Sequence, residues 1–186
     1  LRAEIEEATG FPMSFEGIYR WIVFLPSKMH PNVPVLSRYY GVFKNGKIKD
    51  RGIATRRRDT PPIILRCLRE MLLILAETEN VREFHAKLPF VYKIIEKYVR
   101  LLRSGTVPIE ELVVRKRLSR HPNEYGYRML QAIVASQLVK EGIDVNAGQS
   151  VNYIITNDKS RIPNGRVLAL ELCGNNKIYD DEAYVA

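Results

Sequence analysis

Hydrophobic positions follow a strand-like pattern in the first third of the chain. Residues 15–25 read FEGIYRWIVFL and are rich in aromatic and β-branched side chains, which predicts a strand with Tyr19 and Trp21 on the same face. A second apolar run, YYGVF, is followed by Asn45-Gly46. Asn-Gly between two β-rich runs is a strong hairpin signal. We therefore expect strands at 39–43 and 48–55 that are joined by a turn at 44–47.

Helical patterns flank this β-rich part. Residues 1–8 predict an amphipathic helix that ends at Gly10. A longer helix is expected to begin with Thr60 or Asp59 as its N-cap and Pro61 as its first residue, and to end near Glu77. The next helix is expected at 81–103, where Pro89 should kink or divide it.

The last part of the chain combines short helical and strand patterns. We expect a helical turn at 109–112, a strand at 113–118, a helix at 127–141, strands at 151–156 and 166–172, and a helix that begins near 179–184. The fold class that follows is α+β, in which a partial β-sheet with a hairpin precedes a mostly helical domain with a small β element. We place the boundary near Thr60, which gives domains at 1–59 and 60–186.

Positive charge is concentrated in one segment. The net charge of the chain is +8, and residues 38–70 contain ten basic side chains against three acidic ones, an excess of seven. Arg56, Arg57 and Arg58 are consecutive, and Asp59 is the only acid beside them. Part of this charge must therefore face solvent or an anionic partner, and we favour a phosphate backbone. A second basic cluster contains Arg115, Lys116, Arg117 and Arg120.

The sequence contains no familiar catalytic motif. It lacks a nucleophile elbow, a P-loop, a dinucleotide-binding glycine pattern, HExxH and a zinc quartet. Its three histidines belong to separate elements, and its acidic pairs are adjacent, so their side chains diverge. Cys67 and Cys173 match neither a zinc motif nor a disulfide framework, which favours a reduced cytoplasmic compartment. No apolar run is long enough to span a bilayer, so we expect no membrane partner.

The concentrated positive charge and the lack of a catalytic motif favour nucleic-acid binding as the function. A basic hairpin and helix entrance that also carry Tyr39 and Tyr40 suit a surface that follows a duplex through phosphate contacts. Three alternatives stay open: a solvated basic face, a stand-alone nucleic-acid-binding module and an RNA-binding accessory factor. Stacked aromatic side chains on an exposed sheet would favour the RNA-binding factor. An open sheet with an exposed apolar edge would favour a protein partner.

The order and spacing of several motifs resemble the palm-to-thumb region of archaeal family B DNA polymerases. Arg38-Tyr39 matches the end of the family's K-K-R-Y motif, with Leu36 and Ser37 in place of the lysines. Arg51-Gly52 and Arg57-Arg58-Asp59 match the family's R-G-x-x-x-x-R-R-D motif. The similarity continues through KRLSR at 116–120, Glu124-Tyr125, VNYII at 151–155 and Tyr179-Asp180.

The resemblance implies a right-hand polymerase whose thumb grips the primer–template duplex. Residues 1–59 would then be the distal part of the palm, and residues 60–186 would be the thumb. On the palm side, the DNA-binding residues would be Arg38, Tyr39, Arg51, Arg56, Arg57 and Arg58. On the thumb side, they would be Arg115, Lys116, Arg117, Arg120 and Tyr125.

The resemblance also implies a partner chain. The metal-binding aspartates of the family's palm, its fingers and its exonuclease have no counterpart in this sequence. The chain would thus be a C-terminal fragment or the small polypeptide of a polymerase split between two genes, and we favour the split enzyme. We expect no catalytic residue and no cofactor in this chain, which alone should be inactive. Mg²⁺ is expected in the active site of the larger chain, and the further expected partners are duplex primer–template DNA and a sliding clamp.

Overall fold

The computed structural model describes residues 1–126, 129–174 and 178–185. The chain forms two compact units, Leu1–Arg51 and Gly52–Ala186. Helices occur together with two three-stranded antiparallel sheets, which confirms the α+β fold class. The two compact units meet after Arg51. The boundary near Thr60 was expected between two domains of different identity, and it stays a prediction.

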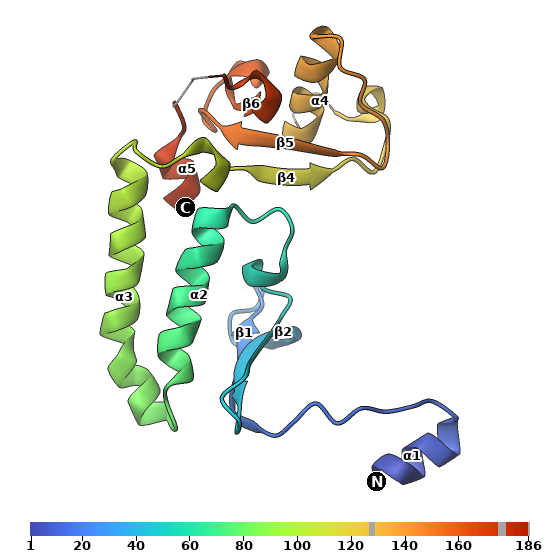
Figure 1. Ribbon diagram of the computed structural model, residues 1–186, viewed down its shortest axis with the longest axis vertical. Coiled ribbons are helices and arrows are strands. Elements are labelled where there is room, and N and C mark those ends of the chain that lie inside the picture. The colour runs from blue at the N-terminus through green and yellow to red at the C-terminus, as the bar shows by residue number, and fades with distance from the viewer. Residues whose placement is uncertain (127–128, 175–177, 186) are drawn as a thin grey trace. The chain divides into compact units, whose positions relative to one another are not determined.

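The first unit consists of a short helix and one sheet. Helix α1 (Arg2–Thr9) ends at Gly10, whose left-handed φ of 69° is typical of a helix C-terminus. The hairpin turn is closed by the Gly46 N–H, which donates to the Phe43 carbonyl, and by the Phe43 N–H, which donates to the Lys47 carbonyl. The helix and the hairpin turn lie where they were predicted. The sheet contains β1 (Tyr19–Pro26), β2 (Pro34–Phe43) and β3 (Ile48–Arg51) in that order (Figure 1).

Several predictions about this part of the chain are wrong. The strand expected at 15–25 begins at Tyr19, and the strand expected at 39–43 already begins at Pro34. The return strand ends at Arg51 instead of position 55, because Gly52 adopts a φ of 63° and the chain turns into a short 3₁₀ helix, η1 (Ala54–Arg56). In addition, β1 contains a bulge, since Tyr19 pairs with Phe43 while Trp21 pairs with Val42. A bulge inserts one residue and thereby reverses the face on which the following side chains lie. Tyr19 and Trp21 therefore lie on opposite faces.

Aromatic side chains cover both faces of this sheet. On one face, the Tyr19 ring stacks on Phe43 at 4.4 Å between centroids and meets the edge of Tyr39 at 6.4 Å. Gly41 makes this packing possible, because a Cβ at that position would lie 3.0 Å from the Tyr19 ring and 2.8 Å from the Trp21 carbonyl oxygen. On the other face, Trp21 meets the edge of Tyr40 at 6.1 Å.

Two long helices dominate the second unit. Helices α2 (Pro62–Ala76) and α3 (Val81–Arg103) lie side by side (Figure 1). The bounds of α3 match the prediction, and Pro89 does not divide the helix. The Asn80 side chain caps α3 by accepting a hydrogen bond from the Glu83 N–H at 3.0 Å.

The predicted N-terminus of α2 is wrong. Its first residue is Pro62 instead of Pro61, and no side chain caps it. Thr60 is not the cap, because the helix begins one residue later than expected and Pro61 occupies the cap position; the Thr60 hydroxyl donates to the Ala54 carbonyl at 2.7 Å. The Asp59 carboxylate accepts hydrogen bonds from basic side chains instead.

The remainder of the second unit packs helices against a small sheet. Gln137 of α4 (Leu130–Lys140) joins this helix to the outer edge of β6 (Val167–Ala169), because its side-chain amide donates to the Val167 carbonyl at 2.8 Å and accepts from the Ala169 N–H at 2.9 Å. The predicted helix start at Tyr127 lies outside the described residues. The elements are β4 (Val114–Arg117), α4 (Leu130–Lys140), β5 (Ser150–Ile155) and β6 (Val167–Ala169), with sheet order β4-β5-β6.

Helix α5 (Asp181–Val185) is fastened to this sheet by a buried tyrosine. The Tyr184 hydroxyl donates to the Leu112 carbonyl at 2.8 Å and accepts from the Ile155 N–H at 2.9 Å. Burial is the main cause that raises the pKa of Tyr184. The strand predicted to reach 172 ends at Ala169 and continues as a 3₁₀ turn. Within the described residues, no helix has the length and apolar character needed to cross a membrane.

Candidate nucleic-acid interface

The segment that leads into α2 presents three arginines on a fixed turn. Residues 53–55 are half-buried, whereas Arg56, Arg57 and Arg58 are exposed. The hydrogen bond from Thr60 to Ala54 closes the segment on itself. The consecutive guanidinium groups therefore start from an ordered backbone.

Asp59 joins this segment to β4. Its carboxylate accepts two hydrogen bonds from Arg57, Nε to Oδ1 at 2.9 Å and Nη2 to Oδ2 at 2.8 Å. The Lys116 Nζ donates to the same Oδ2 at 2.8 Å. The hydrogen bonds from Arg57, followed by the one from Lys116, hold the pKa of Asp59 well below its usual value, although burial opposes this shift. The Asp59 side chain is 17% exposed, so solvent screens these contacts less than it would at an open surface.

The basic side chains of β4 point to two different faces of the sheet. Alternation along a strand places Arg115 and Arg117 on one face and Lys116 on the other. Arg115 pairs with Asn152 of β5, and the Arg117 Nε donates to the Gly148 carbonyl at 3.0 Å. Asp59 therefore binds Lys116, whose side chain lies on the opposite face of β4 from the two exposed arginines.

Arg58 and Arg115 line a common pocket of about 390 Å³. The other polar residues of the pocket are Thr60, Glu110 and Asn152. Neither arginine forms an ion pair with another residue in the described part of the chain. The structure thus brings together one arginine from each predicted basic cluster. These two arginines and the three residues of the Asp59 hydrogen bonds form a group that we call the Asp59 corner: Arg57, Arg58, Asp59, Arg115 and Lys116.

Tyr125 is hydrogen-bonded to the loop that contains Arg120. Its hydroxyl oxygen accepts hydrogen bonds from the backbone N–H of Ser119 at 2.6 Å and of Arg120 at 3.0 Å, and it lies 3.1 Å from the Ser119 hydroxyl. The hydrogen bonds from Ser119 are the main cause that lowers the pKa of Tyr125. The Arg120 side chain is exposed. A direct contact of Tyr125 with DNA stays a prediction, and the contacts of its hydroxyl indicate a positioning role.

Three predicted site residues lie in the first unit. Tyr39 of β2 pairs in register with Arg51 of β3, so their side chains share one face of the sheet. The Arg38 side chain lies on the other face of the sheet, because the side chains of neighbouring residues in a strand point to opposite faces. Burial, followed by the adjacent Tyr39, raises the pKa of Tyr19 to about 12. How these residues contribute to binding stays a prediction.

Two contributors to the site were missed at the level of sequence. Asn152 and Glu110 belong to the Arg58–Arg115 pocket, but neither is basic, so the search for positive charge did not select them. The alternation of RKR in a predicted strand did carry a usable signal, since it separates Lys116 from the two arginines. Among the described residues, no group of three or more His, Cys, Asp or Glu side chains is arranged to hold a metal ion.

The chain is similar to archaeal DNA polymerases over most of its length. DNA polymerase 2 of Aeropyrum pernix is 30% identical over 152 residues, which cover 82% of this chain and 17% of that protein. A DNA polymerase of Pyrococcus glycovorans is 26% identical over 173 residues, which cover 93% of this chain and 20% of that protein. The chain therefore spans one fifth or less of the length of these two relatives.

Structure and family comparisons agree with these similarities. The solved structure of the family B DNA polymerase from Pyrobaculum calidifontis shares the fold over 99% of this chain and 22% of that chain, with a TM-score of 0.68 and 19% identity. The model of DNA polymerase family B matches residues 10–185. Since this match covers nearly the whole sequence, the chain belongs to DNA polymerase family B.

Proposed function

We propose that this chain is the distal palm and thumb of a family B DNA polymerase and that it holds primer–template duplex DNA. A larger chain would supply the exonuclease, the fingers and the palm aspartates that bind Mg²⁺. Residues 1–59 would belong to the palm and residues 60–186 to the thumb. The observation that carries the proposal is the Asp59 corner, where Arg58 and Arg115 line one pocket without an ion-pair partner in the described residues.

The chemistry of this corner suits a phosphate backbone. Guanidinium groups donate several hydrogen bonds in a plane and match phosphate oxygens well. Arg117 extends from the same face of β4 as Arg115, which adds a further cation beside the pocket. Contacts of this kind position a duplex without reading its sequence, as a polymerase requires.

Exposed apolar side chains in the first unit support a protein partner. Phe11, Phe15 and Ile18 are 74%, 71% and 57% exposed, and they lie in a segment without regular secondary structure. Several large apolar side chains exposed within one short segment are typical of sites that another polypeptide covers. The relatives are several times longer than this chain and could contain the covering part within one polypeptide.

Primer extension tests the whole proposal. The assay uses this chain alone, the larger polymerase chain of the same source alone, and the two together, and it measures complex formation on the same samples. We expect extension or increased processivity in the mixture, because the thumb holds the duplex near metals bound by the other chain. If the chain binds duplex DNA but neither joins the larger chain nor changes extension, a stand-alone nucleic-acid-binding module is the better description.

DNA binding tests the role of the Asp59 corner. The double variant R58A/R115A should bind a duplex about tenfold more weakly, and the slope of log K against log salt should fall by about 2, because two phosphate contacts are removed. R82A/R103A removes two exposed arginines elsewhere in the second unit and serves as the matched control. Equal affinities and slopes for the double variant and the wild type would remove the corner from the interface.

A further inference from the structure

Two ion pairs connect α2 to α3 on an outer face of the helix pair. The Lys87 Nζ lies 2.7 Å from a Glu77 oxygen, and the Lys97 Nζ lies 3.0 Å from a Glu70 oxygen. The Tyr98 hydroxyl also donates to Glu70 at 2.6 Å. Glu70 lies on α2 and Glu77 is the residue at its C-terminal cap, so the two ion pairs mark two ends of one surface.

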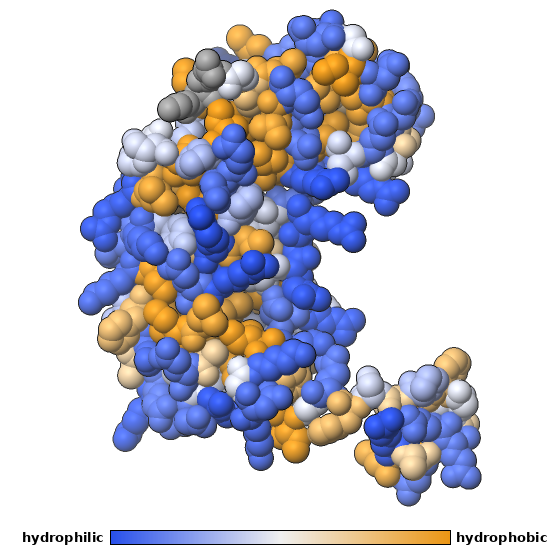
Figure 2. Space-filling model, viewed as in Figure 1, coloured by the Kyte–Doolittle hydropathy of each residue, from blue (hydrophilic) through white to orange (hydrophobic). Residues whose placement is uncertain are grey.

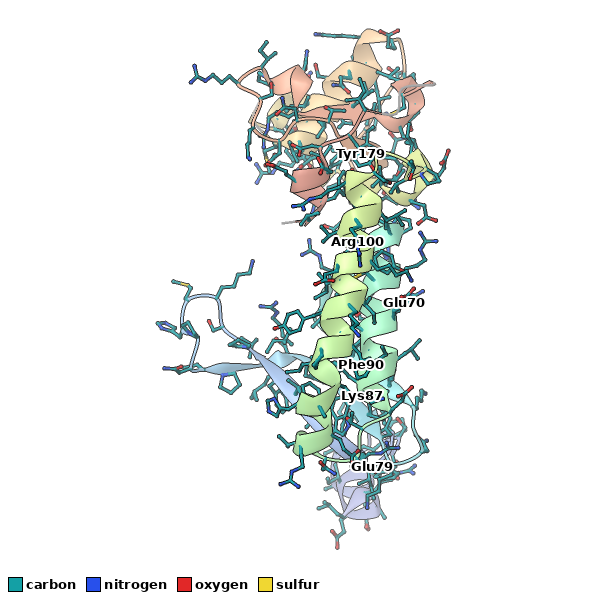
Figure 3. All side chains as sticks on the ribbon, turned by 90° about the vertical axis from the view of Figure 1, so that its left-hand side faces the viewer. Glu70, Glu79, Lys87, Phe90, Arg100 and Tyr179 are labelled. Carbon is teal, nitrogen blue, oxygen red and sulfur yellow. The ribbon has the colours of Figure 1, made fainter. Side chains whose placement is uncertain are left out.

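Apolar side chains lie between these ion pairs. Leu73 follows Glu70 by three positions and precedes Glu77 by four, which places it on their side of α2. Phe90 follows Lys87 by three positions on α3, and Figure 3 shows the two residues next to each other. Leu73 is 60% exposed and Phe90 is 51% exposed. Figure 2 shows hydrophobic residues gathered over the lower half of this helix pair.

One cation of this surface has no ion-pair partner among the described residues. Lys93 places its Nζ 5.6 Å from the centroid of the Phe90 ring, and Lys87 places its Nζ 5.8 Å from the same ring. Cation–π contacts of this kind are weak in water and leave the ammonium available to a carboxylate. We call this surface the Phe90 face; its residues are Glu70, Leu73, Glu77, Lys87, Phe90, Lys93 and Lys97.

We propose that the Phe90 face binds an acidic amphipathic segment of a partner protein. A bulky apolar side chain of the segment packs against Leu73 and Phe90, and a flanking Asp or Glu pairs with Lys93. Such a segment complements both properties of the surface, an apolar centre and an unpaired positive charge beside it. This interaction is separate from the grip on DNA proposed above.

Charge distribution favours a protein segment over a nucleic acid at this face. Glu70 and Glu77 lie on the surface and already neutralise Lys97 and Lys87, so a phosphate backbone would meet two carboxylates. A backbone-tracking surface gains affinity from unpaired cations and gains little from exposed Leu and Phe side chains. The Asp59 corner differs, because Arg58 and Arg115 have no ion-pair partner among the described residues and line a pocket whose single carboxylate is that of Glu110.

A labelled peptide tests the proposal on the whole chain. The probe is a fluorescein-labelled helical peptide with Leu at positions i, i+3 and i+7 and Glu at the flanking positions. Fluorescence anisotropy gives the affinity, and amide chemical shifts identify the surface used. We expect shifts at 87–97, and F90A and K93E should each weaken binding about tenfold, as expected for the centre of a small interface.

Matched controls separate this outcome from general charge effects. K140E changes the net charge by the same amount as K93E at an exposed position of α4 and should alter the affinity less than about twofold, as a charge outside the interface would. A peptide with Lys in place of Glu should not bind. F90A should keep the DNA affinity of the wild type, since Phe90 lies outside the Asp59 corner.

Three results would overturn the proposal. The first is the absence of binding at about millimolar peptide, the weak limit of useful affinities. The second is equal peptide affinity for F90A and the wild type. The third is a DNA duplex that shifts the amides at 87–97 and displaces the peptide, which would assign the face to nucleic acid.

Discussion

The Asp59 corner and the Phe90 face both place basic side chains beside carboxylates, and the role of the carboxylate differs. In the corner, one carboxylate that is 17% exposed binds Arg57 and Lys116, which belong to distant parts of the sequence. In the Phe90 face, Glu77 is 64% exposed and binds a single lysine on the facing helix. The corner leaves other arginines unpaired, whereas the face leaves exposed apolar side chains and one lysine.

This difference shows that a count of charges does not identify a partner. Exposed ion pairs contribute little to stability because water and salt screen them. A shielded carboxylate with several charged donors organises its surroundings more strongly. Burial and unpaired neighbours therefore distinguish a phosphate-binding corner from a protein-binding face, although both are basic.

The largest expected effect comes from the carboxylate of the corner. D59N should lower the free energy of unfolding by about 2 kcal/mol, because the charged hydrogen bonds from Arg57 and Lys116 lose their acceptor. Urea denaturation measures the change. D144N, at an exposed position of a loop, should stay within about 0.5 kcal/mol. Equal effects of the two variants would contradict the organising role of Asp59.

The same contribution should depend on pH. The pKa of Asp59 is lower in the folded chain than its ordinary value of about 4, so its stabilisation is present above pH 4 and is lost as the pH falls toward the folded value. The gap between wild type and D59N should thus be smaller at pH 3 than at pH 7. Urea titrations at both pH values measure it, and a constant gap would speak against an ionised Asp59 as the cause.

Within the Phe90 face, the two carboxylates should differ. E70Q should cost about 1 kcal/mol, because Glu70 accepts from both Tyr98 and Lys97 while partial exposure weakens these bonds. E77Q should cost less than about 0.5 kcal/mol, since its single ion pair is exposed. Thermal or urea unfolding of both variants tests the order, and a larger loss for E77Q would reverse it.

The smallest expected effect is local. Y125F removes the acceptor of the Ser119 and Arg120 N–H groups, so these two amides should exchange with solvent several-fold faster. Y92F, which removes an exposed hydroxyl on α3, should leave them unchanged. Hydrogen exchange resolved by residue measures both, and unchanged protection in Y125F would rule out the positioning role.

Local signals in the sequence were sufficient for several elements. Asn45-Gly46 predicted the hairpin because few dipeptides favour its turn, and the apolar spacing of 81–103 predicted α3 with its bounds. The bulge in β1 was not predicted, because alternation continues in the sequence whether or not one residue is inserted in the pairing. The expected Thr60 cap was wrong because the sequence did not show that α2 begins at Pro62, which places Pro61 at the cap position.

The candidate site depended more on tertiary contacts. The sequence located both basic clusters, yet the bond between Lys116 and Asp59 joins residues 57 positions apart and has no local signature. The pocket shared by Arg58 and Arg115 arises from the same contact between the segment before α2 and β4. Which residues bind DNA stays a prediction, because that depends on a duplex as well as on the fold.

Gln137 also occupies hydrogen-bonding groups at an edge of a sheet. The outer edge of β6 carries backbone groups that could accept a strand from another molecule, and the Gln137 amide already occupies the Val167 carbonyl and the Ala169 N–H. An unoccupied edge of this kind is a starting point for intermolecular β-sheets and aggregation. One side chain on a helix thus takes two hydrogen-bonding groups of this sheet edge that a strand of another molecule would need.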